Sequence, residues 1–144
     1  MAEKKEKDDR FKVFGTISFT ATTKVNNFIT YLQEGKVMAT KCKKCGQTYF
    51  PPRYDCYKDF THDLEWIEVK GAGKLVSYSK LGLGPAGFEG DIPYSIALLN
   101  YGDFQVFGRI AKDVPDNEIK IGMNMKTVPN KLPNGQLNFV FQKA

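Results

Sequence analysis

Three cysteines and one aspartate in a short segment constrain this chain more than any other feature. Cys42 and Cys45 are followed by ten intervening residues and then by Cys56 and Asp59, a CxxC…CxxD arrangement. Two such knuckles, joined by a short arm, can bring four donor atoms to the corners of a tetrahedron, as in structural zinc sites. The spacing therefore predicts a zinc ribbon in which Asp59 is the irregular fourth ligand.

The fourth ligand has a second candidate. A carboxylate oxygen is a legitimate zinc ligand, so a Cys3Asp site is expected. His62, the only histidine of the chain, follows Asp59 by three residues and is the alternative fourth ligand. A further alternative is a metal-free cluster of reduced cysteines. Bound zinc is expected to be structural, because a ribbon of about twenty residues buries too little apolar surface to fold alone.

The cysteine count and the charge distribution indicate the compartment and the kind of ligand. All three cysteines fall within fifteen residues, and this odd number fits metal binding in a reducing cytoplasm better than a disulfide framework. No apolar run approaches the ~18 residues of a membrane span, so a cytoplasmic protein without a membrane partner is expected. Residues 36–58 alone sum to +5, which equals the net charge of the whole chain. This basic segment is expected to attract phosphate, on nucleic acid or on coenzyme A.

Hydrophobic periodicity divides the chain into three parts. Residues 1–23 are expected to be a flexible lead and an extended arm, and residues 24–63 an amphipathic helix, stopped at Gly35, followed by the zinc ribbon. From residue 64 short β-like runs alternate with turn signals, which predicts an OB-type Greek-key β-barrel over 64–144. The fold class is therefore mainly β. The expected strands are 64–69, 74–81, 94–101, 104–111, 123–128 and 137–142.

An apolar arm and a loop rich in glycine and proline lie outside the predicted helix, ribbon and strands. The arm over residues 11–23 is apolar, and it is expected either to lie on a partner protein or to fold back as an extra strand on the chain's own barrel. Its apolar residues are Phe11, Val13, Phe14, Ile17 and Phe19. Residues 82–93 hold four glycines and two prolines around Phe88, which predicts a mobile loop on the barrel.

Catalytic motifs are missing from the sequence. It has no Ser/His/Asp pattern, no GxSxG, no GxxxxGK[ST] phosphate loop, and no cysteine outside the metal cluster that could act as a nucleophile. The chain is therefore predicted not to be an enzyme by itself.

The order of motifs resembles the zinc-ribbon (rubredoxin-like) plus OB-fold proteins that are associated with acyl-CoA thiolases. The resemblance covers about residues 24–142, and its most specific part is the CGxxYFPPR stretch that ends at Arg53. A short helix precedes this stretch, and Trp66, Gly71, Gly73 and the loop from Pro85 to Tyr94 follow it in the family's order. The family usually has four cysteines, and this sequence departs from that pattern at Asp59.

The resemblance implies an accessory role. Members of this family accompany thiolases or thiolase-like synthases, as in archaeal acetoacetyl-CoA thiolase/HMG-CoA synthase complexes and the bacterial benzoylsuccinyl-CoA thiolase. What it implies here is a small non-catalytic subunit in a hetero-oligomer with a thiolase-fold catalytic subunit. Its ribbon and barrel would dock on the thiolase and help to hold CoA or acyl-CoA.

The residues themselves offer groups for both ends of coenzyme A. Four cations near the cysteines, Lys41, Lys43, Lys44 and Arg53, could meet its phosphates with charge-assisted hydrogen bonds. Phe88 could cover the pantetheine or acyl part. The alternatives are that the cations are simply solvated and that Phe88 folds back on the barrel.

Two other functions remain open from the sequence. The main alternative is a single-stranded nucleic-acid-binding module, since OB barrels and zinc ribbons both bind nucleic acids. Nucleic acid is nevertheless the disfavoured partner, because residues 59–144, which hold the predicted barrel, sum to −1. The third possibility is an independent protein that binds or hydrolyses acyl-CoA.

Overall fold

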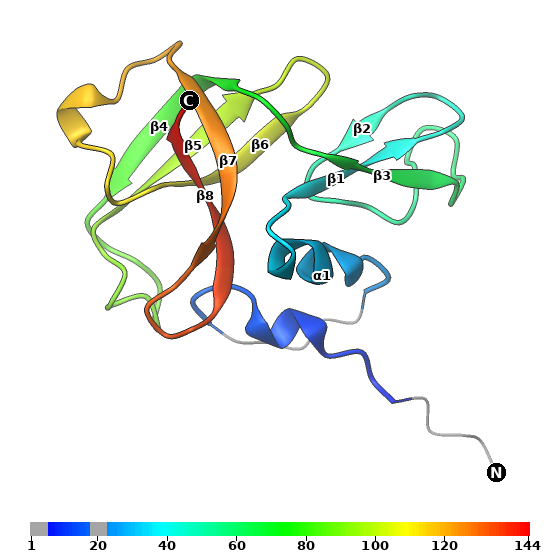
Figure 1. Ribbon diagram of the computed structural model, residues 1–144, viewed down its shortest axis with the longest axis horizontal. Helices are drawn as coiled ribbons and strands as arrows, with labels where there is room; N and C mark the ends of the chain where they lie inside the picture. The colour runs from blue at the N-terminus through cyan, green and yellow to red at the C-terminus, as the bar shows by residue number, and fades with distance from the viewer. Residues whose placement is uncertain (1–5, 18–22) are drawn as a thin grey trace.

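The computed structural model describes residues 6–17 and 23–144 and contains two β-sheets beside a short helix (Figure 1). The first sheet has the strand order β2-β1-β3, and the second is a closed barrel with the order β4-β5-β6-β8-β7. The ribbon strands are β1 (Met38–Cys42), β2 (Thr48–Tyr49) and β3 (Leu64–Glu68). The barrel strands are β4 (Gly73–Leu81), β5 (Tyr94–Asn100), β6 (Gln105–Ile110), β7 (Asn124–Lys131) and β8 (Leu137–Lys143).

The barrel confirms the predicted fold class. Its third and fifth strands, β6 and β8, pair in parallel, whereas its other neighbouring strands are antiparallel. Buried and exposed positions alternate at the start of β4 and of β7, as the period of two predicts. The interior is filled by fully buried apolar side chains, among them Leu75, Leu99, Val106, Met125 and Phe141.

Gly108 on β6 allows two aromatic rings to approach the backbone. A Cβ at this position would lie 2.8 Å from a ring carbon of Phe139 and 3.0 Å from one of Phe141. Both rings come from β8, so the absence of a side chain at Gly108 lets β6 and β8 lie side by side with their aromatic residues packed between them.

The helix α1 (Asn27–Gln33) joins the two sheets through one core. Phe28, Ile29 and Leu32 are its buried face, and they belong to the same apolar cluster as the barrel interior. The helix ends at Gly35, whose φ is 86°, with backbone hydrogen bonds from Gly35 to Leu32 and from Lys36 to Tyr31 that form a Schellman motif. In the described residues no helix has the length and apolar content needed to cross a membrane.

Strand β3 belongs to the ribbon's sheet and not to the barrel. All six expected strands are present, but β3 pairs with β1 along its whole length, from Met38 opposite Glu68 to Cys42 opposite Leu64. The expected boundary at residue 64 therefore falls inside the ribbon's sheet. The reason is physical, since hydrophobic alternation identifies a strand and its buried face but carries no information about which sheet it joins.

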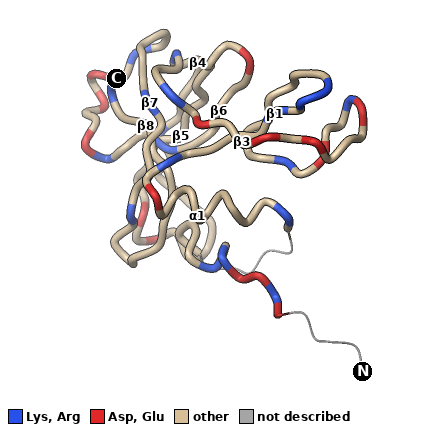
Figure 2. Tube along the Cα trace, turned by 45° about the vertical axis from the view of Figure 1, so that its right-hand side comes forward, with Lys and Arg blue, Asp and Glu red and all other residues tan. Residues whose placement is uncertain are grey.

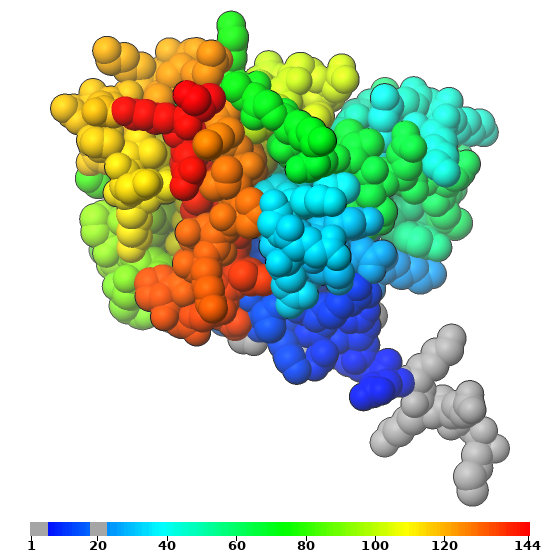
Figure 3. Space-filling view, viewed as in Figure 1, coloured from blue at the N-terminus to red at the C-terminus, as the bar shows by residue number. Residues whose placement is uncertain are grey.

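The N-terminal segment lies on the chain's own barrel rather than standing free. Its 3-10 helix η1 (Arg10–Val13) is followed by a parallel bridge between Phe14 and Leu137, and Phe11, Val13 and Phe14 pack against the main core. Figure 3 shows this segment against α1 and the β7–β8 hairpin. Residues 11–17 thus fold back on the chain's own barrel, but as a 3-10 helix and a single bridge rather than as the expected extended arm or extra strand. Phe19 is outside the described residues.

Candidate metal centre

The first knuckle is a tight turn around Cys42. The backbone N–H of Gly46 donates to the carbonyl of Cys42 at 2.9 Å, and the N–H of Cys42 donates to the carbonyl of Gln47 at 2.9 Å. Gly46 has a φ of 78°, which only glycine adopts without steric cost. This turn positions Cys45, the fourth residue of the knuckle, beside Cys42.

The second knuckle repeats this geometry around Cys56. The N–H of Phe60 donates to the carbonyl of Cys56 at 2.9 Å, and the N–H of Cys56 donates to the carbonyl of Thr61 at 3.0 Å. Phe60 takes the place of Gly46 and has a φ of 58°. Asp59 therefore has the same place in its knuckle as Cys45 has in the first, which is the position of a metal ligand.

The four expected donors converge on one point. Ligand atoms of Cys42, Cys45, Cys56 and Asp59 all lie within 4.8 Å of one another. Sγ of Cys42 is 3.3 Å from Oδ2 of Asp59, and the sulfurs of Cys45 and Cys56 are 3.5 Å apart. Two thiolates that each bind zinc at about 2.3 Å in a tetrahedron are roughly 3.8 Å apart. The residues therefore fit a zinc ion with modest outward adjustment.

Hydrogen bonds favour the ionised, metal-binding form of two of the four donors, Cys56 and Asp59. Burial opposes ionisation of Cys56, but the hydroxyl of Tyr49 and backbone N–H groups of the second knuckle outweigh it and lower the pKa of this thiol. Burial likewise opposes ionisation of Asp59, whose pKa is lowered by hydrogen bonds from the Thr61 N–H and the neighbouring thiols. Burial raises the pKa of Tyr49 to about 12, aided by its contact with Cys56, so this phenol keeps its proton.

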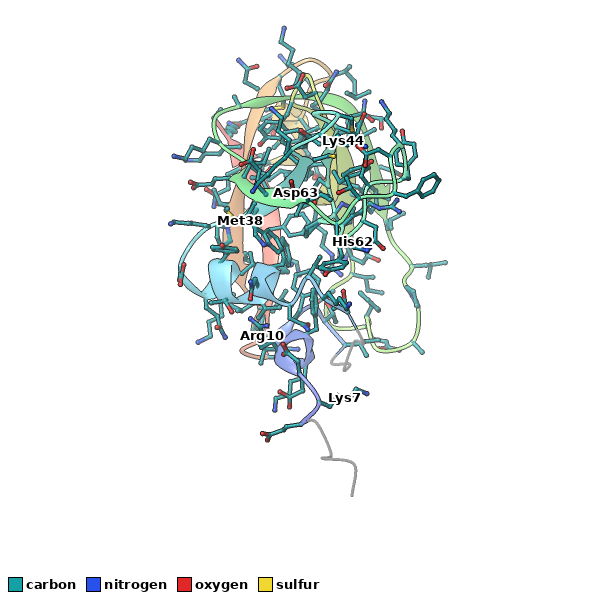
Figure 4. All side chains as sticks on the ribbon, turned by 90° about the vertical axis from the view of Figure 1, so that its right-hand side faces the viewer. Lys7, Arg10, Met38, Lys44, His62 and Asp63 are labelled. Carbon is teal, nitrogen blue, oxygen red and sulfur yellow. The ribbon has the colours of Figure 1, made fainter. Side chains whose placement is uncertain are left out.

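His62, the alternative fourth ligand, contacts Asp55 and Tyr54 instead of the donor cluster. Its Nδ1 pairs with a carboxylate oxygen of Asp55, and its ring stacks on Tyr54 with centroids 5.1 Å apart. Figure 4 shows His62 on the loop that leads into β3. His62 is not part of the group of donors that converges between the knuckles.

The ribbon's cations lie on the first knuckle and on the arm between the two knuckles. Lys43 lies 3.6 Å from Asp63 in an exposed ion pair, and Lys44 extends into solvent from the same knuckle. The guanidinium of Arg53 lies over the rings of Tyr49 and Tyr57, at 5.3 and 5.9 Å from their centroids. Figure 2 shows basic residues at the tip of the β1–β2 hairpin.

Phe88 lies far from these cations. It belongs to the loop between β4 and β5, which Figure 1 shows on the opposite side of the molecule from the ribbon. The ring is half-buried and packs near Tyr94, with the Arg109 guanidinium 5.4 Å from its centroid. Phe88 thus folds back on the barrel, and the five residues considered for coenzyme A do not meet in one site.

The structure reveals one polar group that the sequence did not single out. Arg109 on β6 donates to Asp91 at 2.7 Å and to the hydroxyl of Thr16 at 3.3 Å, and its guanidinium lies 4.2 Å from the Tyr94 ring centroid. These residues come from three distant segments, so no local spacing marks them. Together they join the N-terminal segment to the β4–β5 loop.

The N-terminal segment also reaches the loop between β7 and β8. Asn134 donates to the backbone carbonyl of Thr16 at 3.3 Å, and Gln136 donates to that of Lys12 at 2.9 Å. The loops after the first and the fourth barrel strands are those that OB folds use, with the adjoining sheet face, to bind oligonucleotides. Here both loops contact the chain's own N-terminal segment.

Comparison with known proteins identifies the ribbon. Residues 30–65 match the family described as "ChsH2, rubredoxin-like zinc ribbon domain". A DUF35 domain-containing scaffold protein of Methanocaldococcus jannaschii is 33% identical over 94 residues, which are 64% of this chain and 66% of that protein. The subunit BbsA of benzoylsuccinyl-CoA thiolase from Thauera aromatica is 35% identical over 60 residues, 42% of this chain and 40% of that subunit. The alignments thus span just under two thirds of the first relative and less than half of the second.

Solved structures share the fold. The Ltp2-ChsH2(DUF35) aldolase superposes with a TM-score of 0.69 at 19% identity, over 85% of this chain and 95% of that one. A DUF35 family protein from Sulfolobus solfataricus has a TM-score of 0.52 at 23% identity, over 82% of this chain and 81% of that one. The resemblance predicted from the sequence motifs is therefore confirmed, for both the ribbon and the barrel.

Proposed function

We propose that this chain, a zinc-ribbon and OB-fold protein of the ChsH2 and DUF35 type, is a non-catalytic, zinc-binding subunit of a thiolase-type acyl-CoA complex. It would dock on the thiolase-fold catalytic subunit and help to hold CoA or acyl-CoA. The scaffold protein and the thiolase subunit among its relatives support this role.

The observation that carries the proposal is the closure of the metal centre by four protein donors. Ligand atoms of Cys42, Cys45, Cys56 and Asp59 lie within 4.8 Å of one another and would supply all four positions of a tetrahedral zinc, whereas a catalytic zinc keeps one position open for water or substrate. Both Cys42 and Cys56 are fully buried. Zinc held in this way would stabilise the ribbon fold, and the carbon–carbon chemistry would belong to another chain.

Coenzyme A would be contacted mainly from the ribbon. The cations Lys41, Lys43, Lys44 and Arg53 lie on β1, the first knuckle and the arm between the knuckles, where they could meet phosphates of a CoA that the partner also holds. Phe88 would then contact a different part of the ligand or none, since it lies on the far side of the barrel. Localisation in the cytoplasm is part of the same proposal, because the three free cysteines fit a reducing compartment.

Binding of single-stranded nucleic acid is the weaker proposal. The two barrel loops that would grip an oligonucleotide already contact the N-terminal segment through Thr16, Asn134 and Gln136. A nucleic acid would have to displace this segment together with the partly buried rings of its neighbours Phe11 and Phe14.

The test is reconstitution with the catalytic partner. The wild-type chain should copurify with a thiolase-type subunit identified by mass spectrometry, and omission of the chain should abolish or strongly reduce thiolysis of the acyl-CoA substrate. Full activity of the catalytic subunit alone would refute the proposal. Lys43→Glu should raise the KM for CoA while the complex still assembles, and Lys112→Glu on the barrel serves as the control with the same change of charge.

A further inference from the structure

Phe60 is held in a costly backbone conformation that leaves its ring in water. It is the one non-glycine residue with positive φ among residues 6–17 and 23–144, and 82% of its surface is exposed. A left-handed conformation costs a residue with a Cβ roughly 1–2 kcal/mol. The first knuckle avoids this cost with Gly46. Neither packing nor a hydrogen bond of the side chain offsets it at Phe60.

Two further aromatic side chains lie on the same short segment. Tyr57 is 54% exposed and Tyr54 is 42% exposed. The backbone between them is fixed, because the hydrogen bonds of Cys56 with Phe60 and Thr61 close the turn at 2.9 and 3.0 Å. Rigidly presented aromatic rings lose little conformational entropy on binding and are the residues that dominate protein interfaces. We call residues 53–60 the aromatic knuckle.

The rings of the two tyrosines already have partners within the chain. The ring of Tyr54 stacks on His62 and also lies 4.8 Å from the ammonium of Lys24. Arg53 lies over Tyr57. Phe60 therefore offers the open ring of this segment. Binding of a single strand needs several free faces for successive bases, whereas one open ring surrounded by buttressed aromatic residues suits insertion into a pocket of a protein.

Cations outnumber carboxylates in the segment around Phe60, since residues 41–63 hold five lysines and arginines and three aspartates. Asp63 pairs with Lys43, Asp55 pairs with the imidazole of His62, and Asp59 lies in the donor cluster. Lys58, two residues before Phe60, makes no ion pair within the described part of the chain. A complementary surface must therefore carry carboxylates around an apolar pocket.

We propose that the aromatic knuckle is the anchor by which this chain binds its catalytic partner, with Phe60 inserted into an apolar pocket rimmed by acidic residues. The proposal rests on the proposed function, since the partner is the thiolase-type subunit. The backbone cost at Phe60 is then compensated in the complex, where the exposed ring becomes buried.

Phe60→Gly separates binding from folding. Glycine is the natural residue for this φ, as Gly46 shows, so the variant should keep its zinc and have an unchanged or higher melting temperature. Its Kd for the thiolase-type subunit that copurifies with the wild-type chain should rise at least tenfold by calorimetry. Lys58→Glu should also weaken binding, with a loss that shrinks as salt is added. Leu83→Gly, which removes an equally exposed apolar side chain from the β4–β5 loop, should bind like wild type.

The outcomes are distinguishable. If wild type and Phe60→Gly bind the partner equally, the anchor is refuted while the proposed function remains. If the wild-type chain binds no thiolase-type subunit, the proposed function fails and the anchor fails with it. If the wild-type chain binds a fluorescent single-stranded oligonucleotide at low salt and Phe60→Gly does not, the knuckle is a nucleic-acid contact and the protein anchor is overturned.

Discussion

The hydroxyl oxygen of Tyr49 lies 3.2 Å from Sγ of Cys56. The same oxygen accepts the backbone N–H of Tyr57 at 3.2 Å, so its own proton is left to point at the sulfur. A sulfur that accepts a hydrogen bond is stabilised as the thiolate, which is the form that binds metal. Tyr49 is thus a supporting residue of the metal centre, placed by strand β2, although it contributes no ligand atom.

Removal of this hydroxyl should weaken zinc binding. Tyr49→Phe keeps the buried ring but leaves the Cys56 sulfur without its donor, and loss of such a supporting hydrogen bond typically costs about tenfold or more in metal affinity. Competition with a chromophoric chelator measures the change. Tyr57→Phe is the matched control, because it removes a hydroxyl from an exposed ring; equal affinities in the two variants would contradict the role of Tyr49.

Asp59 should behave as a ligand in a set of substitutions. Its place is equivalent to that of Cys45, so Asp59→Cys should bind one zinc at least as tightly as wild type, whereas Asp59→Ala should lose affinity by tenfold or more. His62→Ala should leave zinc binding unchanged, because its ring pairs with Asp55. Zinc content and the cobalt-substituted absorption spectrum report these changes. A large loss in His62→Ala with none in Asp59→Ala would reverse the assignment.

Removal of zinc should unfold the tip of the ribbon and spare the barrel. Cys42, Tyr49 and Cys56 form a small buried cluster of their own, while the base of the ribbon shares the barrel's core through Ala39 and the neighbouring Trp66. A cluster of this size cannot fold without metal. With chelator, amide exchange should therefore accelerate in residues 42–63 and remain slow in β5, β6 and β8. Equal acceleration throughout the barrel would show that the two clusters unfold together.

Local patterns predicted much of this architecture because their determinants lie close in sequence. The knuckle spacing located the four donors, since each turn is formed by hydrogen bonds across only four or five residues. Short β-like runs between turn signals located every barrel strand, and Gly35 marked the end of α1. Contacts between distant segments had no such signature. The pairing of β3 with β1 and the bonds of Arg109 with Thr16 and Asp91 depend on the folded topology, which single-sequence periodicity does not encode.

Gly108 gives a direct test of the packing between β6 and β8. In Gly108→Ala the new Cβ would lie 2.8 Å from the ring of Phe139, so the ring or the strand must shift, and overpacking of this kind costs about 1–3 kcal/mol of unfolding free energy. Gly90→Ala is the control, because a Cβ there meets nothing within 4 Å. Urea unfolding compares the two; equal stabilities would mean that the rings relax without cost.

Asp91 should make the stability of the protein depend on pH below neutrality. The carboxylate and the Arg109 guanidinium are only 13% and 20% exposed. Burial opposes ionisation of Asp91, but hydrogen bonds from Thr16 and Arg109, with the nearby charge of Lys112, outweigh it and lower its pKa. A lowered pKa in the folded state means that ionised Asp91 contributes stability at pH values above the unfolded-state pKa of about 3.9. This contribution is lost as the pH falls through the folded-state pKa.

Asp91→Asn should therefore be less stable than wild type by roughly 2 kcal/mol at neutral pH, and the difference should shrink as the pH is lowered below about 4. Urea unfolding between pH 3 and pH 8 measures this, with Asp116→Asn as the control, because the Asp116–Lys80 pair is exposed on both sides and should contribute at most about 1 kcal/mol. A difference between wild type and Asp91→Asn that stays constant over the whole range would show that the ionised carboxylate adds nothing beyond its shape.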